Sequence, residues 1–119
     1  MKNKLAIIGG TGVYDPQLLT EMEQLEVVTR YGTALLTQGR YQGEKVVFLA
    51  RHGVEHSTPP HMVNYRANIA ALVKLGVTRV IATAAVGSLN ETMPPGTMVL
   101  LHQFLDFTKG RETTFFTGG

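Results

Sequence analysis

The 119-residue sequence contains no cysteine. This absence excludes a disulfide framework, a thiolate metal site and a cysteine nucleophile. Lysine and arginine are scattered and form no basic run, although the formal net charge is +2. Charge therefore gives no sign of a nucleic-acid interface, and we expect no nucleic-acid partner.

Long hydrophobic runs are also absent. The longest uncharged stretch, residues 92–105, contains two prolines, a glycine and a histidine and is too short to span a bilayer. The apolar residues 5–8 follow Lys2 and Lys4 but are too few for the core of a signal peptide. We expect no membrane association and a cytoplasmic location. With 44% apolar and 17% charged residues, the chain fits one globular domain, residues 1–119.

The pattern along the chain predicts an α/β fold with a mixed central sheet and flanking helices. Two continuous apolar runs predict strands buried on both faces, and turn residues between two further runs predict an antiparallel hairpin. Apolar spacing predicts one long helix that ends at Gly76, and Asp15 with Pro16 predicts the start of a short helix. The expected strands cover residues 5–8, 25–29, 34–41, 44–50, 77–83 and 97–107, and the expected helices cover 15–23 and 64–75.

One long and one short helix are too few to cover both faces of such a sheet. The fold is therefore expected to be incomplete, with other subunits or a further part of the domain against the bare face. We expect much apolar surface to be exposed, which favours association over a stable monomer. The final residues, 117–119, have no feature of a natural terminal helix or strand.

Residues 9–12, Gly-Gly-Thr-Gly, follow the first buried strand. Such a loop can bring backbone N–H groups and the Thr11 hydroxyl to an anion, but it is also typical of a plain tight turn. It is neither a Walker sequence nor a complete dinucleotide fingerprint, because Asp15 stands where the third glycine would be.

Arg51 and His52 follow the end of another expected strand. A guanidinium beside an imidazole is a suitable clamp for a phosphate, because arginine can bind two oxygens at once. His56 and His61 lie nearby, so zinc binding is a second interpretation, and ordinary surface or packing histidines are a third. Two prolines in this stretch and the absence of an H-E-x-x-H motif oppose the zinc site.

Two other segments are small or polar. Residues 83–88 are small at the end of a buried strand, which permits close approach to a ligand or simply tight packing. Residues 64–68 are polar at a helix start, where capping and a solvated face are the plainer interpretation.

Taken in order, these segments resemble the methylthioadenosine phosphorylases of the purine nucleoside phosphorylase family. The matching motifs are 7–12, 49–53 with His56, 60–61, 63–68 and 84–89, and the segments 102–104 and 110–112 resemble methylthioinosine phosphorylase-like members. The resemblance covers essentially the whole chain.

This resemblance implies a homotrimeric enzyme that cleaves a purine nucleoside with inorganic phosphate as co-substrate and needs no metal or other cofactor. Its phosphate-site positions correspond to Thr11, Arg51, His52, Ala84 and Ala85. We expect the neighbours of the substrate site to include Gly10, His56, Asn64, Tyr65 and Gly87, and the resemblance gives them no assured roles. No catalytic residue is assigned.

Two departures from the family stand out. Ala84 replaces a threonine that many methylthioadenosine phosphorylases have, so a hydroxyl contact is lost while backbone contacts can persist. Family members are about twice as long, so the chain resembles the N-terminal half and lacks the groups that contact the purine and ribose. The choices between adenine and hypoxanthine and between 5′-methylthio and 5′-hydroxyl sugars stay open. A non-catalytic phosphate-binding or nucleoside-binding module and an assembly subunit are the alternatives.

Overall fold

The computed structural model describes residues 3–10, 18–52 and 58–116. Five strands form one mixed sheet in the order β2-β3-β4-β1-β5. The strands are β1 (Leu5–Gly9), β2 (Thr20–Thr29), β3 (Gly32–Tyr41), β4 (Glu44–Ala50) and β5 (Arg79–Ala82). The other elements with described bounds are one α-helix, α1 (Tyr65–Lys74), and the 3-10 turn η2 (Pro60–Met62).

The sheet joins a parallel half to an antiparallel half. β1 pairs in parallel with β4 on one side and with β5 on the other. β4 pairs antiparallel with β3, and β3 pairs antiparallel with β2. The predicted mixed sheet is confirmed, and so is the hairpin, whose Gln42 and Gly43 adopt the positive φ angles of 49° and 83° that a tight turn needs.

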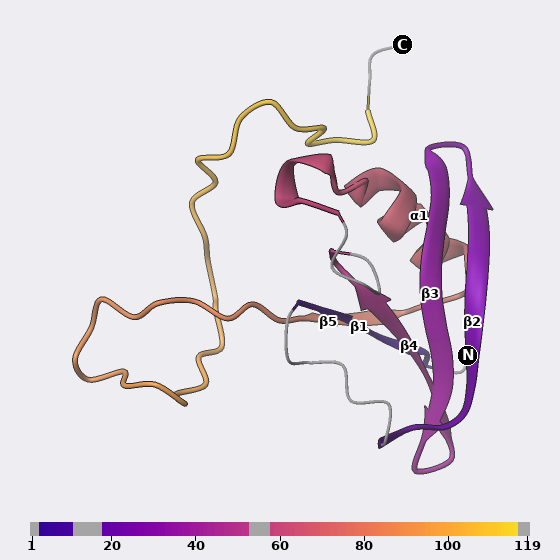
Figure 1. Cartoon of the computed structure of the whole chain (residues 1–119), viewed down its shortest axis with the longest axis horizontal. Helices are drawn as coiled ribbons and strands as arrows, with labels where there is room; N and C mark the ends of the chain where they lie inside the picture. The colour runs from indigo at the N-terminus through magenta and orange to yellow at the C-terminus, as the bar shows by residue number, and fades with distance from the viewer. Residues whose placement is uncertain (1–2, 11–17, 53–57, 117–119) are drawn as a thin grey trace.

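The core lies between α1 and the sheet. Ala71 and Leu72 of α1 are buried against strand residues from β2, β3, β4 and β1, including Val27, Leu36 and Val47. The helix packs over β2 and β3, as Figure 1 shows, and leaves the β5 side of the sheet uncovered. The one long helix that the sequence predicted is confirmed, but it is buried through Ala67, Ala71 and Leu72, whereas Ile69 and Val73 on the expected apolar face are 37% and 70% exposed.

Local contacts fix both ends of α1. The Asn64 side chain accepts a hydrogen bond from the backbone N–H of Ala67 at 3.0 Å and so caps the first turn. At the other end Gly76 has a φ of 77°, the left-handed conformation expected for the residue after a helix. Both ends agree with the sequence prediction.

The short helix predicted over 15–23 is wrong for its second part. Residues 15–17 lie outside the described residues, but β2 begins at Thr20 and runs on through the stretch predicted as a strand from residue 25. Thr20 pairs with Arg40, and an irregularity in the register follows before Glu23 pairs with Gln38. Pairing of β2 with β3 therefore outweighs the local signal for the start of a helix.

The strand predicted over 77–83 exists, but it is shorter and not buried. All four residues of β5 are exposed, because β5 is the edge strand and no described element covers it. The strand predicted over 97–107 is wrong: within residues 83–116 the structure has turns and bends but no strand. After β5 the chain runs away from the sheet and comes back beside α1 (Figure 1). Residues 97–107 therefore have no neighbouring strand among the described residues to pair with.

Candidate functional site

The carboxyl ends of three neighbouring parallel strands meet at one edge of the sheet. β1 lies between β4 and β5, with Gly9 opposite Ala50 and Ile8 opposite Ala82. The ladder continues one step further, because the N–H of Arg51 donates to Gly9 O at 3.0 Å and the N–H of Thr83 donates to Ile8 O at 2.9 Å. This edge of an open α/β sheet is where ligands commonly bind.

Arg51 spans this edge. It follows the last residue of β4, and its Nη1 donates a hydrogen bond to the backbone carbonyl of Thr83 at 3.4 Å, beyond β1 on the β5 side. The side chain is partly buried, and it lies against Gly10, where an added Cβ would stand 2.7 Å from Nη2. The structure therefore brings the predicted residues Gly10 and Arg51 together.

His52 is the next residue along and is also partly buried. Its carbonyl accepts a hydrogen bond from the N–H of Thr58 at 3.0 Å, which joins the described residues on either side of positions 53–57. Thr11 and His56, two further predicted site residues, lie outside the described residues, and so does the Gly12 and Gly53 backbone of the two motifs.

Ala84, Ala85 and Gly87 follow β5 at the same edge and are exposed. An alanine Cβ at Gly87 would meet no atom of the described residues within 4 Å, so the segment is open to them on that side. Thr83, one residue before them, was not predicted as a site residue, yet its carbonyl accepts the hydrogen bond from Arg51 Nη1. Its Oγ1 is buried and has no hydrogen-bond partner among the described residues. The small residues at the end of β5 were the sequence signal that indicated this position.

Asn64 and Tyr65 have partners away from the strand edge. Besides capping α1, Asn64 donates from Nδ2 to Tyr31 O at 2.8 Å. The Tyr65 hydroxyl accepts a hydrogen bond from Arg111 Nη1 at 3.1 Å. Among the described contacts, both residues therefore fasten the start of α1 to other segments, and Asn64 also provides the helix cap that the sequence predicted.

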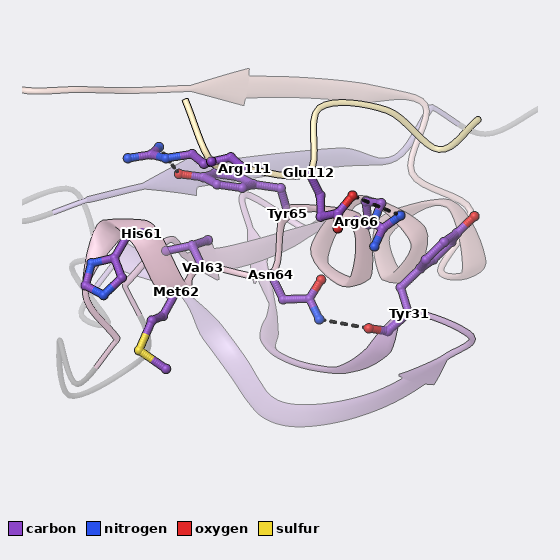
Figure 2. Close-up of a pocket in the computed structure, with 10 residues that line it drawn as sticks. Tyr31, His61, Met62, Val63, Asn64, Tyr65, Arg66, Arg111 and Glu112 are labelled. Atoms are coloured by element: carbon purple, nitrogen blue, oxygen red, sulfur yellow. Dashed lines mark hydrogen bonds and ion pairs between the residues drawn. The ribbon is translucent and has the colours of Figure 1, made fainter. Parts of the chain in front are cut away.

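These contacts border a pocket of about 300 Å³ beside the start of α1. Figure 2 shows Arg111 alongside Tyr65, and Glu112 turned toward Arg66. Nη1 of Arg66 lies 3.5 Å from Oε2 of Glu112, which makes an ion pair. The Arg66 guanidinium also lies 5.2 Å from the centre of the Tyr31 ring. The sequence named residues 110–112 only as a segment of the family resemblance, and it missed Tyr31. The lining residues are Tyr31, His61, Met62, Val63, Asn64, Tyr65, Arg66, Gly110, Arg111 and Glu112.

Within the described part of the chain, no group of three or more histidine, cysteine, aspartate or glutamate side chains is placed to hold a metal ion. Across that part, no helix is both long and apolar enough to cross a membrane.

Comparison with known proteins decides the family. The family model described as "Phosphorylase superfamily" matches residues 4–119. The chain belongs to this superfamily. Its sheet edge, with Arg51 reaching past β1, is thus part of a phosphorylase fold, as the resemblance of its motifs implied.

The curated relatives of this chain are named for several different substrates. A probable 6-oxopurine nucleoside phosphorylase from Thermococcus kodakarensis is 58% identical over 97% of this chain and 43% of its own length. An S-methyl-5′-thioadenosine phosphorylase from Nitrosopumilus maritimus is 49% identical over 98% of this chain and 45% of its own. The chain therefore spans less than half the length of the curated relatives it matches.

Solved structures agree with the fold. Methylthioadenosine phosphorylase from Schistosoma mansoni in complex with adenine superposes with a TM-score of 0.87 at 46% identity, covering 96% of this chain and 42% of that one. The phosphorylase-like α/β fold is confirmed, and the chain corresponds to a part of the solved fold.

Proposed function

We propose that the carboxyl edge of β4, β1 and β5 is the phosphate-binding part of a purine nucleoside phosphorylase. The observation that carries the proposal is the placement of Arg51, whose guanidinium lies over Gly10 and reaches Thr83 where three parallel strands end. Membership of the phosphorylase superfamily supports the proposal, because a phosphorylase uses phosphate as a substrate and therefore needs a site that binds it.

The reaction of the whole protein is phosphorolysis. A phosphate oxygen bonds to the anomeric carbon of the sugar while the bond from that carbon to the purine nitrogen breaks, and the electron pair leaves with the purine. Positive charge develops on the sugar in the transition state, as in glycoside cleavage. Phosphate held by Arg51, His52, Thr11 and backbone N–H groups, with Ala84 and Ala85 contributing through their backbone, is both nucleophile and electrostatic stabiliser. No metal is needed for this step.

The substrate we propose is a purine nucleoside, first of all 5′-methylthioadenosine or 5′-methylthioinosine, which gives 5-methylthioribose 1-phosphate. The names of the relatives support purine nucleosides as a class, and they include both 6-oxopurine and methylthio members. Specificity constants for inosine, adenosine and the two methylthio compounds would decide between them. Equal or better use of the 5′-hydroxyl substrates would move the assignment to the general purine nucleoside phosphorylases.

A homotrimer is the assembly we propose for the whole protein. Exposed apolar side chains on β5, such as Val80 and Ile81, support association of some kind. Sedimentation equilibrium is the direct measurement, and a monomer at working concentration would contradict the proposal.

Activity is best tested in a hybrid protein. We would fuse residues 1–119 to the remaining part of the Thermococcus relative and follow purine release with and without phosphate. Phosphate-dependent release that is lost in Arg51→Ala is the expected result. A folded hybrid that releases no purine, or one that Arg51→Ala leaves unchanged, would overturn the assignment. For the 119-residue chain alone we expect phosphate binding without turnover.

A further inference from the structure

The position of Arg51 depends on what lies beneath its side chain. Arg51 follows β4, whereas its hydrogen-bond partner Thr83 follows β5, and β1 lies between these two strands. Neighbouring strands are about 4.8 Å apart, so the side chain and its hydrogen bond together have to span roughly 10 Å. An arginine can reach this far only with a nearly extended side chain, which must pass directly over the end of β1.

Gly10 is the residue that the side chain crosses. The ladder that pairs Gly9 with Ala50 places Gly10 next to Arg51. A Cβ at position 10 would stand 2.7 Å from Nη2 and 3.6 Å from Cζ of Arg51, and the first distance is well inside van der Waals contact. Any residue other than glycine would therefore displace the guanidinium.

Among the described residues, the conflict falls on the end of a flexible side chain and on no backbone atom. Gly10 is also absent from the glycines with positive φ, so its backbone conformation suits alanine. An alanine at this position would therefore push Arg51 away without straining the strand.

We infer that Gly10 is a positioning residue for Arg51: its missing Cβ lets the guanidinium cross β1 to the Thr83 carbonyl and present its remaining N–H groups to phosphate. The inference rests on the proposed phosphate site. With the described residues the guanidinium makes one contact, at 3.4 Å, which leaves four of its five N–H groups for the anion. The glycine thus acts through the arginine and needs no ligand contact of its own.

A double-mutant cycle tests the inference. Phosphate dissociation constants would be measured by calorimetry for the 119-residue chain and for Gly10→Ala, Arg51→Ala and the double variant. We expect Gly10→Ala alone to weaken phosphate roughly tenfold and to add less than about twofold when Arg51 is already alanine. An equal effect in both backgrounds, or no effect in either, would overturn the role of Gly10.

Gly39→Ala is the matched control. Gly39 lies in β3, and a Cβ there would crowd Leu19 at 3.2 Å and the Thr20 carbonyl at 3.3 Å. This variant should lower the melting temperature while leaving the phosphate affinity unchanged, whereas Gly10→Ala should do the reverse. A loss of stability in Gly10→Ala as large as in Gly39→Ala would indicate a merely structural glycine.

The outcome for the proposed function is separate. If Arg51→Ala binds phosphate as well as the unaltered chain, or if the unaltered chain binds none, the phosphate site falls. The placement of Arg51 is then tested without phosphate, by nitrogen-15 NMR of its side chain. Its Nη signals should show rotation hindered by the Thr83 contact in the unaltered chain and freed in Gly10→Ala. Free rotation in both proteins would overturn the placement.

Discussion

Leu72 and Leu100 have the same side chain in two regions that differ in what surrounds them. Leu72, on α1, is 2% exposed, whereas Leu100, in the segment after β5, is 97% exposed. The first faces strands already joined by hydrogen bonds, and the second faces no described element. Apolar composition supplies the drive for burial, but a partner surface decides whether burial occurs.

The same contrast holds for whole segments. β3 and β4 pair with each other and with further strands, so their β-forming residues stay in register. Residues 97–107 are as strand-like in composition, yet Met98, Phe104 and Phe107 remain mostly exposed. A strand is stabilised by cross-strand pairs, and this segment has none among the described residues.

The largest expected difference is between Leu72→Ala and Leu100→Ala. The first leaves a cavity in the core and should lower the free energy of unfolding by about 2–5 kcal/mol. The second removes an exposed side chain and should change it by less than about 0.5 kcal/mol. Urea denaturation measures both. A cost above 1 kcal/mol for Leu100→Ala would show that the segment after β5 is packed in solution.

Two asparagines repeat the comparison for hydrogen bonds. Asn64 caps α1 and also reaches Tyr31, so Asn64→Ala should lower the free energy of unfolding by about 1 kcal/mol. Among the described residues, the Asn90 side chain accepts hydrogen bonds only from the nearby Thr92 in the exposed segment, so Asn90→Ala should cost less than about 0.5 kcal/mol. Thermal melting of the two variants compares them directly, and equal costs would contradict the difference between the regions.

Thr83 stands at the boundary between the two regions. Its Oγ1 is buried without a partner among the described residues, so Thr83→Val removes no described hydrogen bond. The free energy of unfolding should stay within about 0.5 kcal/mol or rise slightly. A loss above 1 kcal/mol in chemical denaturation would reveal a partner for the hydroxyl outside the described residues.

The smallest expected effect concerns two shifted pKa values. In the packed region, burial and then the charge of Lys45 lower the pKa of Lys4. In the exposed segment, hydrogen bonds from the Thr108 side chain and then its backbone lower the pKa of Asp106 below 3.8. The carboxylate contacts of Asp106 are therefore complete above pH 3.8 and are lost as the pH falls through its lowered pKa.

Thr108→Ala removes the larger of those two contacts. It should raise the pKa of Asp106 toward 3.8 while leaving the pKa of Lys4 unchanged, as followed by NMR titration of both side chains. An unchanged Asp106 pKa would show that the turn at residues 106–108 does not persist in solution.

The sequence predicted the parts of the fold in which local pattern and tertiary partner agree. The hairpin, β1 and α1 with its Asn64 cap and Gly76 are of this kind. The prediction was wrong where a neighbouring strand determines the structure. A strand begins at Thr20 despite the helix start signal at Asp15, and residues 97–107, which have no neighbouring strand, form none. At the site, glycine and arginine motifs indicated Gly10 and Arg51. The role of the Thr83 carbonyl could not be predicted, because every residue has a backbone oxygen and its contacts do not depend on the residue type.

The central claim is that the edge at Gly10, Arg51 and Thr83 binds phosphate, and melting in phosphate against chloride at equal ionic strength tests it most directly. At a phosphate concentration a hundred times the dissociation constant, the folded state should gain about 2.7 kcal/mol. Arg51→Ala should remove most of that gain, and Arg51→Lys should recover only part, because an ammonium lacks the two-pronged geometry of a guanidinium. A cooperatively melting chain whose transition is the same in both salts would contradict the claim.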